Sequence, residues 1–216
     1  EECPPAAIIA NLRRLQKRAL SGYKVSPYVT PERFAEALSP TMVAISLSGE
    51  PTCYSRLPEL VDGLNSEGYT TFLVSNGTNP DVLARCRPYQ AYVSLDAPDR
   101  ETYLALCRPR EDYWDRIHES LAGLGGRRSA IRTTVVRGYN DIAPEGYAAI
   151  YQDSGARFVE VKGYMHLGYS RNRLQRDQMP EHSDVRAFAE KIVEHCDYFI
   201  KDESPASRVV CLERNV

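Results

Sequence analysis

The sequence predicts an α/β fold built on a parallel sheet, and three observations lead to that prediction. Apolar runs of strand length alternate with longer segments whose apolar residues recur with the helical period. The runs are apolar on both faces, which is typical of strands in a parallel sheet that helices cover. Each run is followed by a helical segment, and five such strand–helix units can be counted.

The predicted elements follow one another in a regular order. Gly22 ends a first helix over residues 6–20, and Thr30 caps a second helix over residues 31–38 with Pro31 at its first position. The five strands occupy residues 42–47, 71–75, 91–95, 131–136 and 158–162. The helices between them occupy residues 56–67, 80–85, 100–106, 112–124 and 145–154. A polar loop over 165–180, a helix over 181–195 and a hairpin of 198–200 with 208–212 complete the chain.

The length and the apolar content predict a single domain. The chain has 216 residues, 43% of them apolar, which is enough for one buried core. Within residues 1–216 we expect a helical lead-in to about residue 40, strand–helix repeats over 41–164 and a C-terminal extension over 165–216. The chain does not begin with methionine, so we expect it to be part of a longer reading frame.

Charge, cysteines and hydropathy limit the class of protein. The net charge of −2 gives no global basic field, so binding to a nucleic acid would need a local basic patch. The six cysteines are scattered and none forms C-x-x-C, which predicts reduced cysteines in a cytoplasmic protein. The sequence shows no set of metal ligands, and no apolar run approaches the ~18 residues of a membrane span. We therefore expect no membrane partner.

Polar residues and glycines follow each of the five predicted strands. The carboxyl ends of parallel strands meet at one edge of a sheet, where α/β proteins bind their ligands. Any one of these residues also fits a simple turn, since Asn and Gly are common turn formers. Their convergence predicts a site for a ligand that carries an amine, hydroxyls and a carboxylate. The strand-end residues are Gly49, Glu50, Asn76, Gly77, Asp96, Arg137, Gly138, Lys162 and Gly163.

Lys162 is the strongest single candidate for a catalytic residue. It ends the apolar run that begins at Phe158, in alternation with Glu160. On an ordinary surface such a lysine is only solvated. Partial burial at the mouth of a barrel lowers the pKa of a lysine and frees its amine to attack a carbonyl carbon. This position therefore suggests a lysine that forms a Schiff base in carbon–carbon bond chemistry.

The loop after the fifth strand combines arginines with aromatic residues. Tyr164, His166, Arg171 and Arg173 lie in this loop. Arginines interleaved with tyrosines suit contacts with phosphates and stacking on bases. A solvated loop anchored by its aromatic residues explains the same composition, and His166 alone fits a structural role.

Several stretches of the sequence form an ordered set of strand-end motifs. They are residues 46–52 (SLSGEPT), 71–78 (TFLVSNGT), 92–98 (YVSLDAP), 159–166 (VEVKGYMH), 168–173 (GYSRNR) and 179–182 (MPEH). A Gly-Glu pair alone is a weak motif, whereas the ordered set is specific. These stretches resemble the archaeal-type 4-demethylwyosine synthases, a family of the radical S-adenosylmethionine (SAM) superfamily. The similarity runs over nearly the whole chain, from about residue 12 to residue 212.

The resemblance implies a partial (β/α)6 barrel that carries S-adenosylmethionine and two 4Fe–4S clusters. It implies condensation of N1-methylguanosine in phenylalanine tRNA with two carbons of pyruvate, through a 5′-deoxyadenosyl radical. The cofactor performs the difficult step, and the protein supplies position and a dry environment. It also implies a cytoplasmic monomer that receives electrons from an external donor.

The resemblance further implies roles for individual residues. Lys162 matches a family lysine suited to Schiff-base formation with pyruvate, although a cation there also fits a clamp for the carboxylate. Tyr164, His166, Arg171 and Arg173 are expected to contact the substrate or the tRNA. The residues expected to bind S-adenosylmethionine are Gly49, Glu50, Ser75, Asn76, Ser94 and Asp96.

The superfamily's cluster motif, C-x3-C-x2-C, does not occur in the sequence. Three isolated cysteines elsewhere do not substitute for it, because each thiolate must reach the iron with a fixed orientation. Cys53 follows the Gly-Glu-Pro-Thr stretch and is expected to be an incidental thiol. We therefore expect that the first barrel strand and its cluster loop are missing and that this chain alone is inactive.

Two alternative functions remain compatible with the sequence. The first is a cluster-free aldolase that forms a Schiff base through Lys162, for which turnover would require no iron. The second is a non-catalytic barrel that binds tRNA with an affinity that depends on salt.

Overall fold

The computed structural model describes residues 2–215, which form an α/β fold around one seven-stranded sheet. The strand order is β1-β2-β3-β4-β5-β7-β6, and the pairs from β1 to β5 are all parallel. The antiparallel strands β7 and β6 extend the sheet beyond β5. The strands are β1 (Met42–Ile45), β2 (Thr70–Ser75), β3 (Gln90–Ser94), β4 (Ser129–Val135), β5 (Phe158–Gly163), β6 (Tyr198–Ser204) and β7 (Val209–Arg214).

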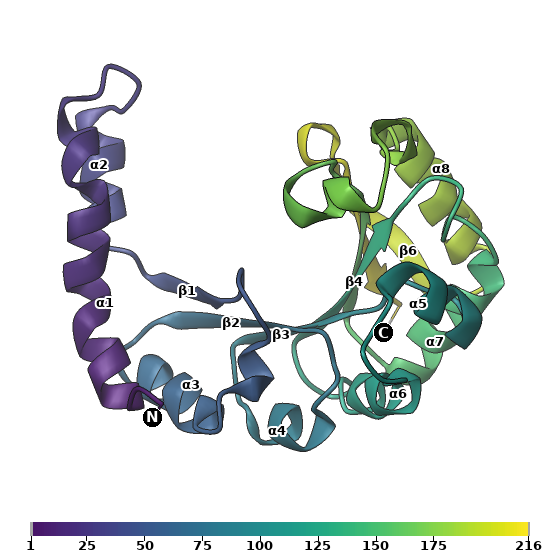
Figure 1. Ribbon diagram of the computed structural model, residues 1–216, viewed down its shortest axis with the longest axis horizontal. Coiled ribbons are helices and arrows are strands. Elements are labelled where there is room, and N and C mark those ends of the chain that lie inside the picture. The colour runs from purple at the N-terminus through teal and green to yellow at the C-terminus, as the bar shows by residue number, and fades with distance from the viewer. Residues whose placement is uncertain (1, 216) are drawn as a thin grey trace.

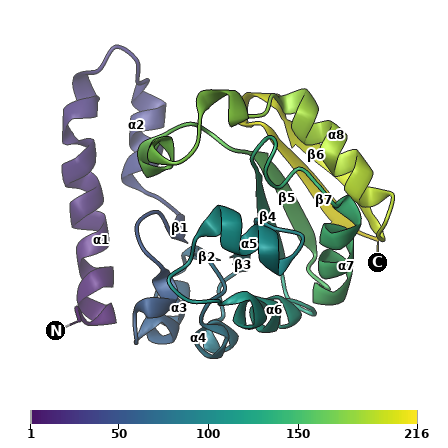
Figure 2. The same ribbon diagram turned by 45° about the vertical axis from the view of Figure 1, so that its right-hand side comes forward.

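The helices form one layer on the outer face of a curved sheet (Figure 1). Helices α3 (Leu57–Ser66), α4 (Pro80–Arg85), α6 (Trp114–Ala122), α7 (Pro144–Ser154) and α8 (His182–Val193) make up this layer. Helix α5 (Arg100–Cys107) lies apart from it, over the region where β3 ends (Figure 2). Helices α1 (Pro5–Leu20) and α2 (Pro31–Leu38) stand together at the β1 end of the sheet (Figure 1), where α1 packs on α3.

The two faces of the parallel strands differ in burial. In β2 and β5 every second residue is fully buried, and the residues between them are half-exposed for most of each strand. The buried set faces the helix layer and includes Leu73, Val93, Ile131 and Val161. The expectation that the strands are apolar on both faces does not hold for β3, β4 and β5: helices cover the outer face, and the inner face of these strands carries polar side chains. Apolar content alone did not reveal this, because residues such as Phe72 and Val74 continue the apolar run on the inner face.

The ends of the chain agree with the elements predicted from the sequence. Thr30 accepts a hydrogen bond from the Arg33 backbone N–H at 3.3 Å, which confirms it as the cap of α2. Strands β6 and β7 form the predicted antiparallel hairpin, although β6 extends to Ser204. The predicted polar loop contains two short 3₁₀ helices, η3 (Gly168–Asn172) and η4 (Arg176–Gln178). Within the described residues, no helix has the length and apolarity to cross a membrane.

Gly77, just after β2, occupies a position that a side chain fits poorly. Its φ of +75° lies in the left-handed region, and an added Cβ would stand 3.0 Å from Cγ1 of Val93. The Gly77 carbonyl also accepts a hydrogen bond from the buried Ser120 hydroxyl at 2.7 Å, so the turn is fixed against α6.

We predict that Gly77→Ala lowers the free energy of unfolding by about 1–3 kcal/mol, because it adds backbone strain and a clash with Val93. Gly22→Ala is the matched control, since an added Cβ at Gly22 meets no atom within 4 Å and its φ is not in the left-handed region. Urea unfolding of both variants measures the difference. Equal stabilities would show that the Gly77 turn tolerates a side chain.

Candidate active site at the carboxyl ends of the strands

A cavity of about 360 Å³ opens where β2 and β3 end. Four residues expected to form the site line it, namely Glu50, Asn76, Ser94 and Asp96. The parallel register brings them together, because each lies at or just beyond the carboxyl end of its strand. The structure therefore joins residues that are up to 46 positions apart in the sequence.

Glu50 is held rigidly at the edge of this cavity. Its Oε1 accepts hydrogen bonds from the Thr52 N–H at 3.1 Å, the Thr52 hydroxyl at 2.7 Å and the Ser75 hydroxyl at 2.8 Å. Its Oε2 accepts one bond, from the Asn76 N–H at 2.8 Å. A carboxylate oxygen accepts more than one hydrogen bond, so Oε2 retains capacity for a further donor such as an ammonium group.

Gly49 and Ser75, the other two residues expected to bind the cofactor, do not line this cavity. Gly49 is exposed in the loop before Glu50, with a φ of +76°, and it does not line the cavity. Ser75 is buried on the outer face, where its hydroxyl donates to Glu50 and accepts from the Gly77 N–H at 3.0 Å. Ser75 therefore positions Glu50 through its hydroxyl, and Gly49 precedes Glu50 in the loop without lining the cavity.

Asp96 connects the cavity to the next strand. Its Oδ1 accepts a hydrogen bond from the Thr134 N–H at 2.7 Å, and its carbonyl accepts one from the Asn140 side chain at 2.8 Å. Desolvation raises the pKa of Asp96 to about 6, even though the Thr134 N–H and the charge of Arg132 oppose the shift. The carboxyl group of Asp96 thus changes charge close to neutral pH.

The wall opposite the strands comes from α5, α6 and the segment between them. Sequence reasoning missed this wall, although the aromatic pair Tyr113–Trp114 at the start of α6 was a usable signal. The Tyr103 and Trp114 rings lie 5.6 Å apart and give the cavity an apolar side. The wall residues are Tyr103, Cys107, Pro109, Arg110, Tyr113, Trp114 and Ile117.

Lys162 lies on the inner face of the sheet and does not line this cavity. It is half-buried, and its register partners are Thr134 in β4 and Val209 in β7. Asp96 bonds the backbone of Thr134, so Asp96 and Lys162 flank the same residue of β4. Asp96, Thr134 and Lys162 thus form a row across the sheet. Asp96 and Lys162 are two strand spacings of ~4.8 Å apart, or about 10 Å.

Below Lys162, the inner face carries an ion pair. Arg132 Nη2 lies 3.0 Å from Oε2 of Glu160, and both side chains are half-buried. The Arg132 guanidinium also lies 4.9 Å from the centre of the Tyr92 ring. Burial, with a smaller contribution from Glu160, raises the pKa of Tyr92 to about 12, so its hydroxyl remains protonated at neutral pH. The inner face is thus a polar, ordered surface beside the cavity.

The loop after β5 begins with Tyr164, one of the residues expected to contact the substrate or the tRNA, and the ring of Tyr164 is buried. Tyr164 is only 5% exposed and packs with Leu106, Val136 and Leu174, so its ring is not free to stack on a base. Its hydroxyl donates to Ser170 Oγ at 3.1 Å and shares a hydrogen bond of 3.0 Å with Nδ1 of His166. Tyr164 therefore supports the loop and orients His166.

Arg171 and Arg173, two of the arginines in this loop, differ in their contacts. Arg173 donates to the carbonyl of Leu106 at 3.2 Å, which ties the loop to the end of α5. Arg171 is exposed within η3. Only Arg171 of the pair is therefore fully available to a partner molecule.

The cysteines do not form a cluster site in the part of the chain that the structure describes. Within residues 2–215, no group of three or more His, Cys, Asp or Glu side chains is arranged to hold a metal ion. Cys53 and Cys107 both line the cavity, and burial raises the pKa of the Cys107 thiol to about 12. Cys107 is consequently a protonated, inert thiol at neutral pH.

Two family models match the chain. The model of the radical SAM superfamily matches residues 8–148, which include the cavity residues from Glu50 to Ile117. A model described as wyosine base formation matches residues 153–214, which include Lys162 and the loop that follows it. The fold and the site thus define a protein of the radical SAM superfamily.

Relatives and solved structures agree on the family within that superfamily. The S-adenosyl-L-methionine-dependent tRNA 4-demethylwyosine synthase of Methanocaldococcus jannaschii is 40% identical over 97% of this chain and 68% of its own length. The Pyrococcus horikoshii protein of the same name is 43% identical over 98% of this chain, which spans 64% of that protein. The chain belongs to the family of tRNA 4-demethylwyosine synthases.

Two solved structures have the same fold as this chain. A structure of TYW1 with a lysine–pyruvate adduct bound is 38% identical and superposes with a TM-score of 0.91, covering 98% of this chain and 70% of that one. A crystal structure of archaeal TYW1 is 36% identical with a TM-score of 0.84, covering 99% of this chain and 72% of that one.

The raised pKa of Asp96 predicts how stability depends on pH. The folded chain keeps the Asp96 proton up to about pH 6, whereas the unfolded chain releases it near 3.8. Between these values the folded state binds more protons, so the free energy of unfolding falls as pH rises. The stability lost in this way amounts to no more than about 3 kcal/mol, and the loss is complete once the pH is well above 6.

We therefore expect Asp96→Asn to be more stable than the wild type at pH 7 and to lose that advantage near pH 4, because Asn retains the acceptor for Thr134. Denaturant unfolding at several pH values measures the effect, with the exposed Asp62→Asn as control. A pH profile identical to that of the wild type would contradict the assignment of the shift to Asp96.

Proposed function

We propose that this chain provides the substrate and cofactor face of a 4-demethylwyosine synthase, which joins two carbons of pyruvate to N1-methylguanosine in tRNA. The sheet, with helices on its outer face and polar side chains on its inner face, would be part of a (β/α)6 barrel. One observation carries the proposal: the rim of the sheet places an anchored carboxylate, Glu50, and a strand-end lysine, Lys162, on either side of Asp96.

The cavity residues fit S-adenosylmethionine. Oε2 of Glu50 accepts one hydrogen bond and has room for the cofactor's ammonium group. Ser94 and Asp96 offer acceptors for ribose hydroxyls, and the Tyr103–Trp114 side offers an apolar surface for the adenine. When bound, the cofactor supplies hydrogen-atom abstraction from the methyl group of N1-methylguanosine. The protein's own part is to hold the reactants in place and to exclude water.

Lys162 is suited to bind pyruvate covalently. Its amine would add to the keto carbon, and loss of the carbonyl oxygen as water would leave a C=N bond. The other lysines of the chain lie elsewhere: Lys17 and Lys191 on α1 and α8, Lys24 in the 3₁₀ helix η1 (Ser21–Val25), and Lys201 in β6, where its amine bonds Glu213. The lysine–pyruvate adduct in the related TYW1 structure supports this role.

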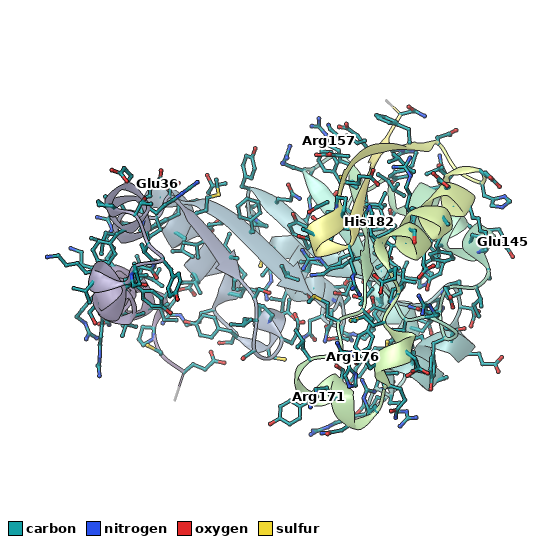
Figure 3. All side chains as sticks on the ribbon, turned by 90° about the horizontal axis from the view of Figure 1, so that it is seen from above. Glu36, Glu145, Arg157, Arg171, Arg176 and His182 are labelled. Carbon is teal, nitrogen blue, oxygen red and sulfur yellow. The ribbon has the colours of Figure 1, made fainter. Side chains whose placement is uncertain are left out.

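The loop after β5 would contact the tRNA. Tyr169 in η3 is 92% exposed and can stack on a base, unlike the buried Tyr164. Arg171 and Arg176 extend from the same region into solvent (Figure 3) and suit phosphate contacts. His166 bonds Tyr164 and Arg173 bonds the carbonyl of Leu106, so both side chains hold the loop.

The described residues do not fit an iron–sulfur cluster. Residues 2–215 contain no grouped thiolates that would bind iron, so we assign no redox step to them. The two 4Fe–4S clusters, the external electron donor and the monomeric state remain predictions from the resemblance.

We predict that sodium borohydride traps pyruvate on the wild-type chain and that Lys162→Arg abolishes trapping, since a guanidinium does not form the C=N bond. Intact-mass measurement after reduction, followed by peptide mapping, locates the adduct. Because trapping needs neither S-adenosylmethionine nor a cluster, it tests this chain on its own.

Lys201→Arg is the matched control, because Lys201 lies in the adjoining hairpin and its pairing with Glu213 survives the change to arginine. It should trap as much pyruvate as the wild type. Trapping that persists in Lys162→Arg, or maps to another lysine, would refute the proposed role of Lys162.

A further inference from the structure

A second hollow, of about 790 Å³, opens at the opposite end of the sheet from the candidate active site. It lies at the amino ends of the parallel strands. None of its lining residues has a role in the proposed reaction. No carboxylate is among the described residues that line it. The lining consists of Gly126, Arg127, Arg128, Gly155, Arg157, Arg214 and Asn215.

The four arginines converge because of the strand topology. Arg127 and Arg128 immediately precede β4, and Arg157 immediately precedes β5. Arg214 ends β7, which runs antiparallel to β5, so the end of β7 meets the start of β5. The Arg214 N–H donates to the carbonyl of Arg157 at 3.0 Å, which confirms that the two residues are neighbours.

Contacts within the protein hold two of these guanidinium groups in place. Arg128 Nε donates to Oε1 of Gln90 at 2.8 Å, and its guanidinium lies 5.2 Å from the centre of the Tyr89 ring and 5.1 Å from that of Phe158. The Arg157 guanidinium also lies 5.1 Å from the centre of the Phe158 ring. Aromatic contacts of this kind fix the planes of the guanidinium groups without neutralising their charge.

The positive charge of this cluster is poorly compensated. Among residues 2–215, only Arg157 of the four arginines has an ion pair, with Glu213 at 3.3 Å, and Lys201 pairs with the same carboxylate. Nε of Arg127 is buried without a hydrogen-bond partner in the described structure. Burial, followed by the nearby charge of Arg87, lowers the pKa of Arg127. Like charges held together in this way repel one another unless an anion lies between them.

We propose that this hollow is a binding site for a phosphate group. Guanidinium groups bind phosphate oxygens through paired, charge-assisted hydrogen bonds, and three neighbouring strand ends supply them here. Figure 3 shows Arg157 on the opposite side of the molecule from Arg171 and Arg176. The site is therefore separate from the arginines proposed to contact tRNA beside the active site. The phosphate group belongs either to a small free ligand or to the backbone of a bound RNA.

The test compares the wild-type chain with the double variant Arg127→Gln/Arg214→Gln. Inorganic phosphate is titrated against chloride at constant ionic strength, and the melting temperature is followed. At ten times the dissociation constant, bound phosphate is expected to raise the Tm of the wild type by about 3–5 °C and that of the variant by less than 1 °C. Arg18→Gln/Arg33→Gln, on α1 and α2, controls for the lost charge and should respond like the wild type.

A second arm measures the affinity for a tRNA transcript by filter binding in phosphate-free buffer. A phosphate-induced Tm rise that the double variant loses, with unchanged tRNA affinity, identifies a small free ligand. A tRNA affinity at least threefold weaker in the double variant than in the control identifies the RNA backbone. If neither response depends on Arg127 and Arg214, the proposal is overturned. Arg214→Gln alone serves if the double variant does not fold, because Nε of Arg127 is buried and its replacement is the expected cause of misfolding.

Discussion

The candidate site depends on how β4 is paired at its carboxyl end. Thr134 donates its backbone N–H to Asp96 on one side, and on the other side it is the register partner of Lys162. Asp96 belongs to the cavity that Glu50 borders, so this single residue of β4 connects the cavity to the lysine. A slip of one residue in β4 would move Lys162 out of this row and exchange the faces of the strand. The geometry of the site is therefore a property of the sheet register.

The division of the sheet into two unlike faces follows from the same register. Branched and aromatic residues fill the outer face beneath the helix layer and supply the core. The inner face instead carries Arg132, Glu160 and Lys162, whose partial burial is tolerated because the first two pair with each other. Stability and function are thus placed on opposite sides of the same strands. The two edges of the sheet also differ. The candidate active site lies at the carboxyl ends of the parallel strands, and the arginine cluster lies at their amino ends.

Much of this arrangement could be predicted from the sequence, because strand and helix periods, the Thr30 cap and the strand-end residues are local signals. Glu50, Asn76, Ser94 and Asp96 were expected together, and they line one cavity. The polar inner face of β4 and β5 was not predicted as a whole, because the neighbouring strand β2 carries Phe72 and Val74 on the same face and so reads as apolar throughout. The α5–α6 wall and the burial of Tyr164 were missed because they depend on contacts between distant segments, such as Tyr164 with Leu106. The arginine cluster is likewise invisible in sequence order, because antiparallel β7 returns Arg214 to the start of β5.

The most direct test of the central claim is a crystal structure of the chain after reduction with borohydride in the presence of pyruvate. The account predicts a three-carbon adduct on Nζ of Lys162, lying on the inner face of the sheet and directed along Thr134 toward the cavity at Asp96. An adduct on a different lysine, or one directed away from that cavity, would show that the cavity and the lysine do not form a single site.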